Sequence, residues 1–133
     1  MTRPNIRPER RTIYVLFLAA TLVACGAGES KVFSETPSPS GGWILRLTVA
    51  ESRMPQGPFY VAAYVIKSGT EETFELFEVK LENDGVPFTT TNIAARWTSG
   101  DTALICLRAT DLPDRGMRVK LGATPHAVEV NQC

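Results

Sequence analysis

The chain has 133 residues, enough for one domain and too few for two of typical size. Lysine plus arginine and aspartate plus glutamate balance at 14 each. The first 24 residues hold four arginines and one glutamate, so residues 25–133 keep 10 basic and 13 acidic side chains, a net charge of −3. Nucleic-acid binding requires clustered positive charge, and electrostatic attachment to anionic lipid requires a polybasic run. The composition argues against both.

Residues 1–24 have the organisation of a secretory signal peptide. Four arginines precede Ile13, and an uncharged apolar run extends from Ile13 to Ala24. A positive start, an apolar stretch of this size and a small residue before the cut are typical of such a segment. A transmembrane helix is the alternative, but twelve residues make only about 18 Å of helix, against about 30 Å of hydrocarbon. We therefore predict that residues 1–24 are removed from the mature protein.

The apolar run closes with Leu22-Val23-Ala24-Cys25. This tetrapeptide resembles the lipobox of bacterial lipoproteins, whose pattern is leucine, a small or aliphatic residue, alanine or glycine, and then cysteine. The resemblance implies cleavage between Ala24 and Cys25, and a diacylglyceryl group joined to the Cys25 thiol through a thioether. Each buried methylene contributes about 0.8 kcal/mol, and a single acyl chain binds only marginally. Two or three chains on Cys25 would therefore hold the protein on the membrane.

The same resemblance implies a location. We expect a lipid-anchored protein of the cell membrane or the outer membrane, with its domain on the periplasmic or extracellular side. Gly26 stands where an inner-membrane retention signal has aspartate, which favours the outer membrane in bacteria that have two membranes. The first expected partner is thus the membrane, through the lipid on Cys25.

Residues 25–42 have the composition of a flexible linker. Small and polar residues follow Cys25 directly, and the segment ends in a turn rich in proline, serine and glycine. We predict three parts: a signal peptide over 1–24, a lipidated cysteine with its linker over 25–42, and a β domain over 43–133. Such a linker would let the domain stand off the membrane.

From residue 43 onward, short apolar runs alternate with turn signals. Residues 43–50 alternate apolar and polar side chains, which is typical of a half-buried strand. Residues 59–66 are apolar throughout and predict a central strand, either covered on both faces or with its tyrosines at the rim. Residues 73–82 fit a strand or one helix face, and the turn signal Asn83-Asp84-Gly85 favours a strand in a hairpin. Further strands are predicted over 93–97, 103–108, 117–121 and 128–131.

About seven to eight short strands, without a convincing amphipathic helix, predict an all-β domain. The pattern suits a small antiparallel β-sandwich or barrel, and the sequence does not decide between the two.

Cys106 and Cys133 remain as an even pair if Cys25 carries lipid. In an exported, oxidising compartment such a pair predicts a disulfide. The closed loop of 28 residues would stabilise the fold by about 3.5 kcal/mol on the chain-entropy model. The alternative is that Cys106 is a small buried hydrophobic residue and Cys133 is free.

No pattern in the sequence points to catalysis or to a cofactor. The single histidine, His126, is expected to be an exposed residue at the start of a strand, and it lacks the neighbours of a zinc site. The sequence contains neither a Gly-x-Ser-x-Gly elbow nor a glycine-rich phosphate loop. We predict no catalytic residue, no metal site and no cofactor.

These observations together favour a non-catalytic, membrane-anchored protein that recognises another envelope protein through its surface and binds no nucleic acid. One alternative is a small-ligand binding module that uses Tyr60, Tyr64 and the tryptophans Trp43 and Trp97. Another is an enzyme acting on cell-wall glycans through the acidic segment Glu71–Asp84, which would require carboxylates to converge in one cleft. Both alternatives have a purely structural explanation. The acidic residues would form a solvated face, and the tryptophans would pack in the core.

Overall fold

Strand formation in this chain follows the alternation of apolar and polar side chains. A computed structural model describes residues 26–83, 85, 87–109 and 112–133, and within these residues it contains eight strands and no helix. The strands are β1 (Ala27–Pro37), β2 (Trp43–Ser52), β3 (Phe59–Lys67), β4 (Thr73–Leu81), β5 (Ile93–Trp97), β6 (Thr102–Leu107), β7 (Arg115–Lys120) and β8 (His126–Val130). Each pairs antiparallel with its neighbours in its sheet.

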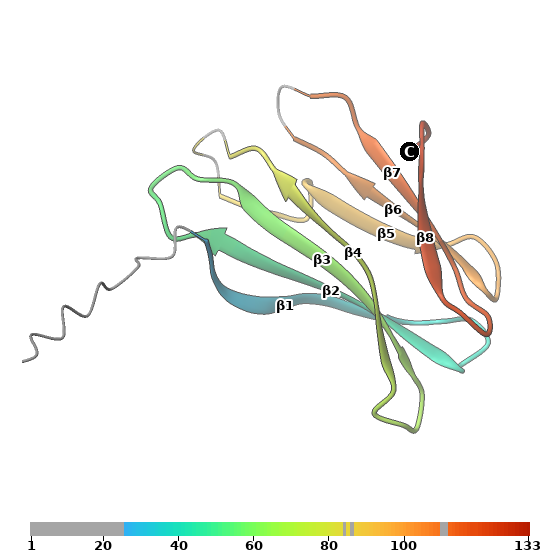
Figure 1. The fold of residues 1–133 in the computed structure, drawn as a ribbon. Helices are drawn as coiled ribbons and strands as arrows, with labels where there is room; N and C mark the ends of the chain where they lie inside the picture. Colours follow the sequence, from blue (N-terminus) through green and yellow to red (C-terminus); the bar gives the residue numbers. More distant parts are fainter. Residues whose placement is uncertain (1–25, 84, 86, 110–111) are drawn as a thin grey trace, which may run out of the picture.

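The strands of the described residues form two four-stranded sheets, ordered β1-β2-β3-β4 and β5-β6-β7-β8. Strands that follow each other in the sequence lie side by side, so each sheet is a simple meander. Figure 1 shows the two sheets as separate layers that face each other. The predicted all-β class is confirmed, and the architecture is a β-sandwich and not a closed barrel.

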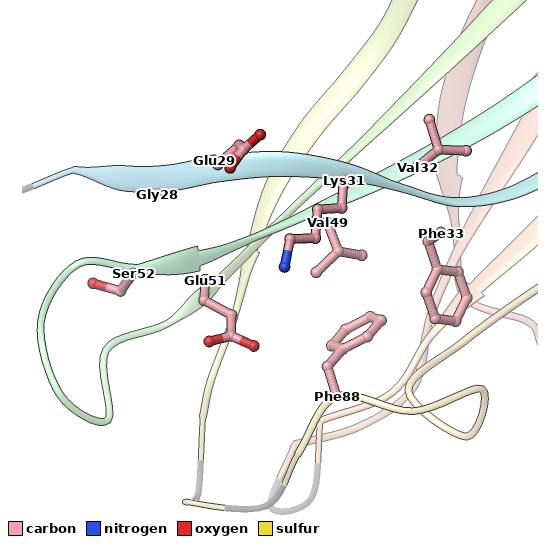
Figure 2. A pocket seen from close by; sticks show the side chains of 9 residues that line it. All are labelled: Gly28, Glu29, Lys31, Val32, Phe33, Val49, Glu51, Ser52 and Phe88. Atoms are coloured by element: carbon pink, nitrogen blue, oxygen red, sulfur yellow. The ribbon is translucent and has the colours of Figure 1, made fainter.

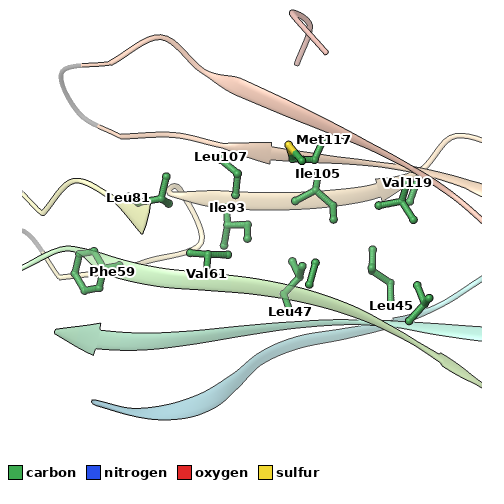
Figure 3. Close-up of a cluster of buried hydrophobic side chains, with 13 residues drawn as sticks. Leu45, Leu47, Phe59, Val61, Leu81, Ile93, Ile105, Leu107, Met117 and Val119 are labelled. Atoms are coloured by element: carbon green, nitrogen blue, oxygen red, sulfur yellow. The ribbon is translucent and has the colours of Figure 1, made fainter. Parts of the chain in front are cut away.

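The core fills the space between the two sheets. Every second side chain of the central strands points inward, and Val61, Ala63 and Val65 of β3 are fully buried there. The buried apolar cluster consists of Leu45, Leu47, Phe59, Val61, Ala63, Val65, Leu81, Ile93, Ala103, Ile105, Leu107, Met117 and Val119 (Figure 3). Burial of one large aliphatic side chain contributes about 1.5–3 kcal/mol, so this cluster is the main source of stability.

Residues 27–37, which the sequence predicts to belong to a flexible linker, form β1 instead. Lys31 of β1 pairs with Val49 of β2, and the pairing extends from Ala27 to Pro37 with register shifts between Ala27 and Ser30 and between Val32 and Ser34. The linker prediction is wrong for this segment because β1 is an edge strand with mostly exposed side chains, where a polar composition is compatible with pairing. Phe33 is the main inward contact of β1, and its ring packs edge-on against Phe88.

The turn at the end of the predicted linker is confirmed. The Ser38 backbone N–H donates to the Trp43 carbonyl at 2.8 Å, and the Gly41 N–H donates to the Ser38 carbonyl at 2.8 Å. Gly41 adopts a φ of 75°, a left-handed conformation that glycine reaches without steric strain. The sandwich therefore contains β1 in addition to residues 43–133.

The segment between β4 and β5 carries the chain from one sheet to the other. None of its described residues within 82–92 belongs to a strand, so the predicted hairpin partner of β4 does not form there. Asp84 of the predicted turn lies outside the described residues. Phe88 of this segment packs against the core. The centroid of its ring lies 5.2 Å from that of Phe33 and 5.1 Å from that of Phe59.

The sandwich has two ends, which we name after the residues that mark them. The Ala27 end is where β1 begins, and Figure 1 shows the loop 53–58 and the described residues of 82–92 and 108–114 at that same end. The Trp43 end is opposite and holds the loops 38–42, 68–72, 98–101 and 121–125. Figure 3 shows the same alignment inside the core, with Phe59 and Ile93 towards one end and Leu45 and Val119 towards the other.

Candidate functional site

The outer face of the β1–β4 sheet is the most distinctive surface of the molecule. Because alternate residues point outward, β3 presents Tyr60 and Tyr64 on this face, and both are half-buried. Ile44 of β2 and Ile66 of β3 form a cross-strand pair on the same face. We call this surface the tyrosine face. The structure decides between the two possibilities for residues 59–66: β3 is buried on its inner side, and its tyrosines lie on an outer side that no other described segment covers.

Ion pairs and rings fix the side chains of the tyrosine face. The Arg46 guanidinium, which lies opposite Tyr64 in the strand register, donates to the Glu35 carboxylate at 2.6 Å. The Lys80 ammonium lies 5.6 Å from the centre of the Tyr60 ring, within the range of a cation–π contact. Partial burial, with Glu75 and Glu78 nearby, raises the pKa of the Tyr64 phenol. The phenol therefore remains a neutral donor at neutral pH.

A shallow hollow of about 460 Å³ lies beside the first residues of β1. Phe33, Val49 and Phe88 form its apolar wall, and Lys31 and Glu51 extend into the same opening (Figure 2). Sequence analysis did not find this site, because it depends on β1 pairing with β2 and on Phe88 folding back. The only local signal was the adjacent pair Val32 and Phe33, an apolar interruption of a polar segment.

The acidic segment Glu71–Asp84 does not form a cleft within its described part. Glu75 and Glu78 lie on the outer face of the edge strand β4, near Tyr64, and Glu72 forms an exposed ion pair with Lys67 at 3.7 Å. They line neither the hollow beside β1 nor the hollows beside Trp43, Leu104 and Cys106. Their arrangement is that of charges spread along a solvated strand.

Cys106 and Cys133 lie next to each other but are free thiols in this structure. The Cys106 thiol donates a weak hydrogen bond to the Cys133 carbonyl at 3.9 Å. Burial, followed by hydrogen bonding to the Cys133 side chain and the charge of that neighbouring thiol, raises the pKa of Cys106 to about 11, although Arg108 and Arg96 act in the opposite direction. The predicted disulfide is not seen, and the fold nevertheless brings both predicted residues together.

The remaining candidate side chains have structural surroundings. His126 is exposed, and its Nδ1 lies 3.1 Å from the Thr124 carbonyl oxygen. Trp43 packs against Phe74 with 5.9 Å between ring centroids, and Trp97 also contacts the core. The buried Trp97 Nε1 has no hydrogen-bond partner in the described part of the chain. Trp43 lies on the core side of the β1–β4 sheet, whereas the tyrosines lie on its outer side. Trp97 belongs to the other sheet.

Ala24 and Cys25, the predicted cleavage and lipidation residues, lie outside the described residues. Within the residues that are described, no group of three or more histidine, cysteine, aspartate or glutamate side chains is arranged to hold a metal ion. The same residues contain no helix long and apolar enough to span a membrane. Comparison of the chain with protein-family models, curated proteins and solved structures found no match.

Proposed function

We propose that this protein is a lipoprotein, anchored to a membrane of the cell envelope through Cys25, and that its sandwich recognises another envelope protein. The anchor rests on the resemblance of Leu22-Val23-Ala24-Cys25 to a lipobox and on the basic and apolar segments before it. Recognition would use the tyrosine face, without catalysis and without a cofactor.

The observation that carries the recognition proposal is the composition of the tyrosine face. Protein interfaces are enriched in tyrosine and arginine, which combine large apolar area with polar ends. Here Tyr60, Tyr64 and Arg46 lie on one sheet surface beside the Ile44–Ile66 pair. Arg46 pairs with Glu35 and Lys80 lies over the Tyr60 ring, so this surface offers both charged groups and apolar area to a partner.

Photocrosslinking in cells tests this proposal. A photoreactive amino acid at Tyr64 should give a protein adduct, whereas the same amino acid at Lys120, on the outer face of the other sheet, should not. Ile66→Asp should reduce the adduct about tenfold, the effect of about 1.4 kcal/mol of binding energy. Equal adducts from both positions, or none from position 64, would contradict recognition through this face.

The hollow beside β1 supports a second candidate, the binding of a small amphiphilic molecule. Its volume of about 460 Å³ lies within the range of small-molecule sites, and its wall of Phe33, Val49 and Phe88 is apolar beside the charged Lys31 and Glu51. Anilinonaphthalene sulfonate, an apolar fluorophore with one anionic group, is a suitable probe. Its fluorescence should rise with the parent protein and not with Val49→Trp, which fills the hollow; an equal rise with both would eliminate this site.

We also propose that Cys106 and Cys133 form a disulfide in the exported protein. The hydrogen bond between Cys106 and the Cys133 backbone shows that the two residues already meet in the fold. An exported protein resides where disulfides persist.

A further inference from the structure

The short connection between Cys25 and the sandwich limits where the sandwich can sit. Gly26 is the only residue between Cys25 and Ala27, the first residue of β1. Two residues of fully extended chain span at most about 7 Å. The Gly26 carbonyl also accepts a hydrogen bond from the Arg53 N–H at 3.2 Å, which ties it to the β2–β3 loop. A lipid on Cys25 would therefore leave the domain no tether with which to stand off the bilayer.

The loops of the Ala27 end carry exposed apolar side chains. Met54 in the β2–β3 loop is 56% exposed, and Leu112 in the β6–β7 loop is 53% exposed. The first of these loops is firmly built, because the Met54 N–H donates to the Ser52 hydroxyl at 3.1 Å and the Gly57 N–H donates to the Met54 carbonyl at 3.0 Å. These bonds order the backbone of the loop on which Met54 is exposed.

A cation accompanies this apolar tip. Arg53, next to Met54, is exposed and has no ion-pair partner among the described residues. Guanidinium groups bind phosphate oxygens through charge-assisted hydrogen bonds. An apolar side chain beside a free arginine matches the boundary between acyl chains and phosphate headgroups.

The Trp43 end differs. Its loops carry polar and charged residues such as Thr70, Glu71 and Asp101. Of the large apolar side chains that are strongly exposed in the described residues, the other two, Val32 and Val128, lie in edge strands and not in these loops. Among the described residues, the strongly exposed apolar loop residues are therefore confined to the end where β1 begins.

We propose that the Ala27 end rests on the surface of the lipid bilayer, with Met54 and Leu112 at the boundary between headgroups and acyl chains. This inference rests on the proposed lipidation of Cys25. The ten residues of β2 span about 33 Å, so the Trp43 end would lie that far from the membrane surface. The tyrosine face would then stand upright and meet a partner held in, or beside, the same membrane.

Photocrosslinking of the lipidated protein in phosphatidylcholine vesicles tests the orientation. Photoreactive amino acids are introduced singly at Met54 and Leu112, and at Thr70 and Asp101 as matched exposed controls from the opposite end. Positions 54 and 112 should form lipid adducts at about ten times the yield of positions 70 and 101, because the controls lie about 33 Å away. Circular dichroism checks that each variant is folded.

Fatty-acid labelling of the same samples separates the two proposals. Labelled protein with equal lipid adducts from both ends, or with protein adducts in place of lipid adducts at position 54, would overturn the orientation and leave the anchor intact. Protein that takes up no fatty-acid label would overturn the anchor, and the orientation with it.

Discussion

The outer faces of the two sheets differ in what covers their apolar side chains. On the β5–β8 sheet, Leu104 and Cys106 point away from the core yet are only 8% and 6% exposed. Leu104 lies between Arg96 and Arg118 in the strand register. These three residues line a hollow on the outer face of the sheet, and Cys133 borders it. Arginine stems can cover apolar surface while their charged ends stay in water. This sheet covers Leu104 and Cys106 with its own chain, whereas Val128, opposite Arg118 on the same face, is 54% exposed.

On the tyrosine face the cover is only partial, with Lys80 over the Tyr60 ring and Arg46 opposite Tyr64. Tyr60, Tyr64, Ile44 and Ile66 remain half-buried, and no segment of the described chain crosses them. The contrast indicates that outward apolar residues have two uses in one small sandwich. Leu104 and Cys106 of the second sheet are covered and contribute to stability, whereas the half-buried residues of the tyrosine face are available for binding.

The largest expected effect is on the covered face. Leu104→Ala should lower the free energy of unfolding by about 2–5 kcal/mol, the range for a truncated buried leucine. Ile44→Ala on the tyrosine face is the matched control and should cost clearly less, because part of that side chain is already in water. Urea unfolding of both variants measures the difference. Equal losses would remove the distinction between the two faces.

Reduction of the exported protein should have the next largest effect. If Cys106 and Cys133 are paired, reduction should lower the free energy of unfolding by about 3.5 kcal/mol, the entropy of closing their loop. Thiol titration of the denatured, unreduced protein should then find no reactive group at these two positions. Two reactive thiols would show that Cys106 and Cys133 are not bonded, and that Cys133 is held against the β5–β8 sheet by packing alone.

In the reduced protein, the cover should slow the chemistry of Cys106. Its pKa is raised from an ordinary value of 9.0 to about 11, so at pH 8 its thiolate fraction should be about one hundredth of that of an ordinary cysteine. Iodoacetamide should alkylate the exposed Cys133 first, as peptide mass mapping would show. Because burial favours the protonated thiol, the contribution of Cys106 to the free energy of unfolding is fully present below pH 9. This contribution is lost as the pH rises towards 11. Equal alkylation rates would contradict the burial of Cys106.

The smallest expected effect lies on the tyrosine face. The Arg46–Glu35 pair is exposed, and its coupling free energy should be only about 0–1 kcal/mol. A double-mutant cycle with Arg46→Gln and Glu35→Gln measures it, and partner crosslinking of the same variants measures its role in recognition. Coupling above about 2 kcal/mol would place this pair among structural contacts.

Local sequence patterns predicted the parts of the fold that have a buried side. The alternation over 43–50 and the apolar run over 59–66 gave β2 and β3 because their inward residues must be apolar. β1 was missed because an edge strand with mostly exposed side chains has no such requirement. The turn signal after residue 82 predicts a hairpin, because nothing local shows that Phe88 instead folds back onto Phe33.

The candidate surfaces depend on contacts between distant segments, which sequence patterns do not show. An apolar β3 is compatible with cover on both faces or on one, and only the arrangement of the sheets decides that Tyr60 and Tyr64 stay uncovered. The hollow likewise requires Val49 and Phe88 to approach across nearly forty residues of chain. The pairing of Cys106 and Cys133 was predicted from their number and compartment, and their proximity in the fold is consistent with it.

The intact mass of the protein purified from cell membranes tests the central claim most directly. The account predicts a chain that begins at Cys25 and carries the added mass of a diacylglyceryl group with two or three acyl chains in all. Cys25→Ser should abolish that mass and leave the precursor uncut. A native protein that begins at Met1, or one whose Cys25 thiol is unmodified, would contradict it.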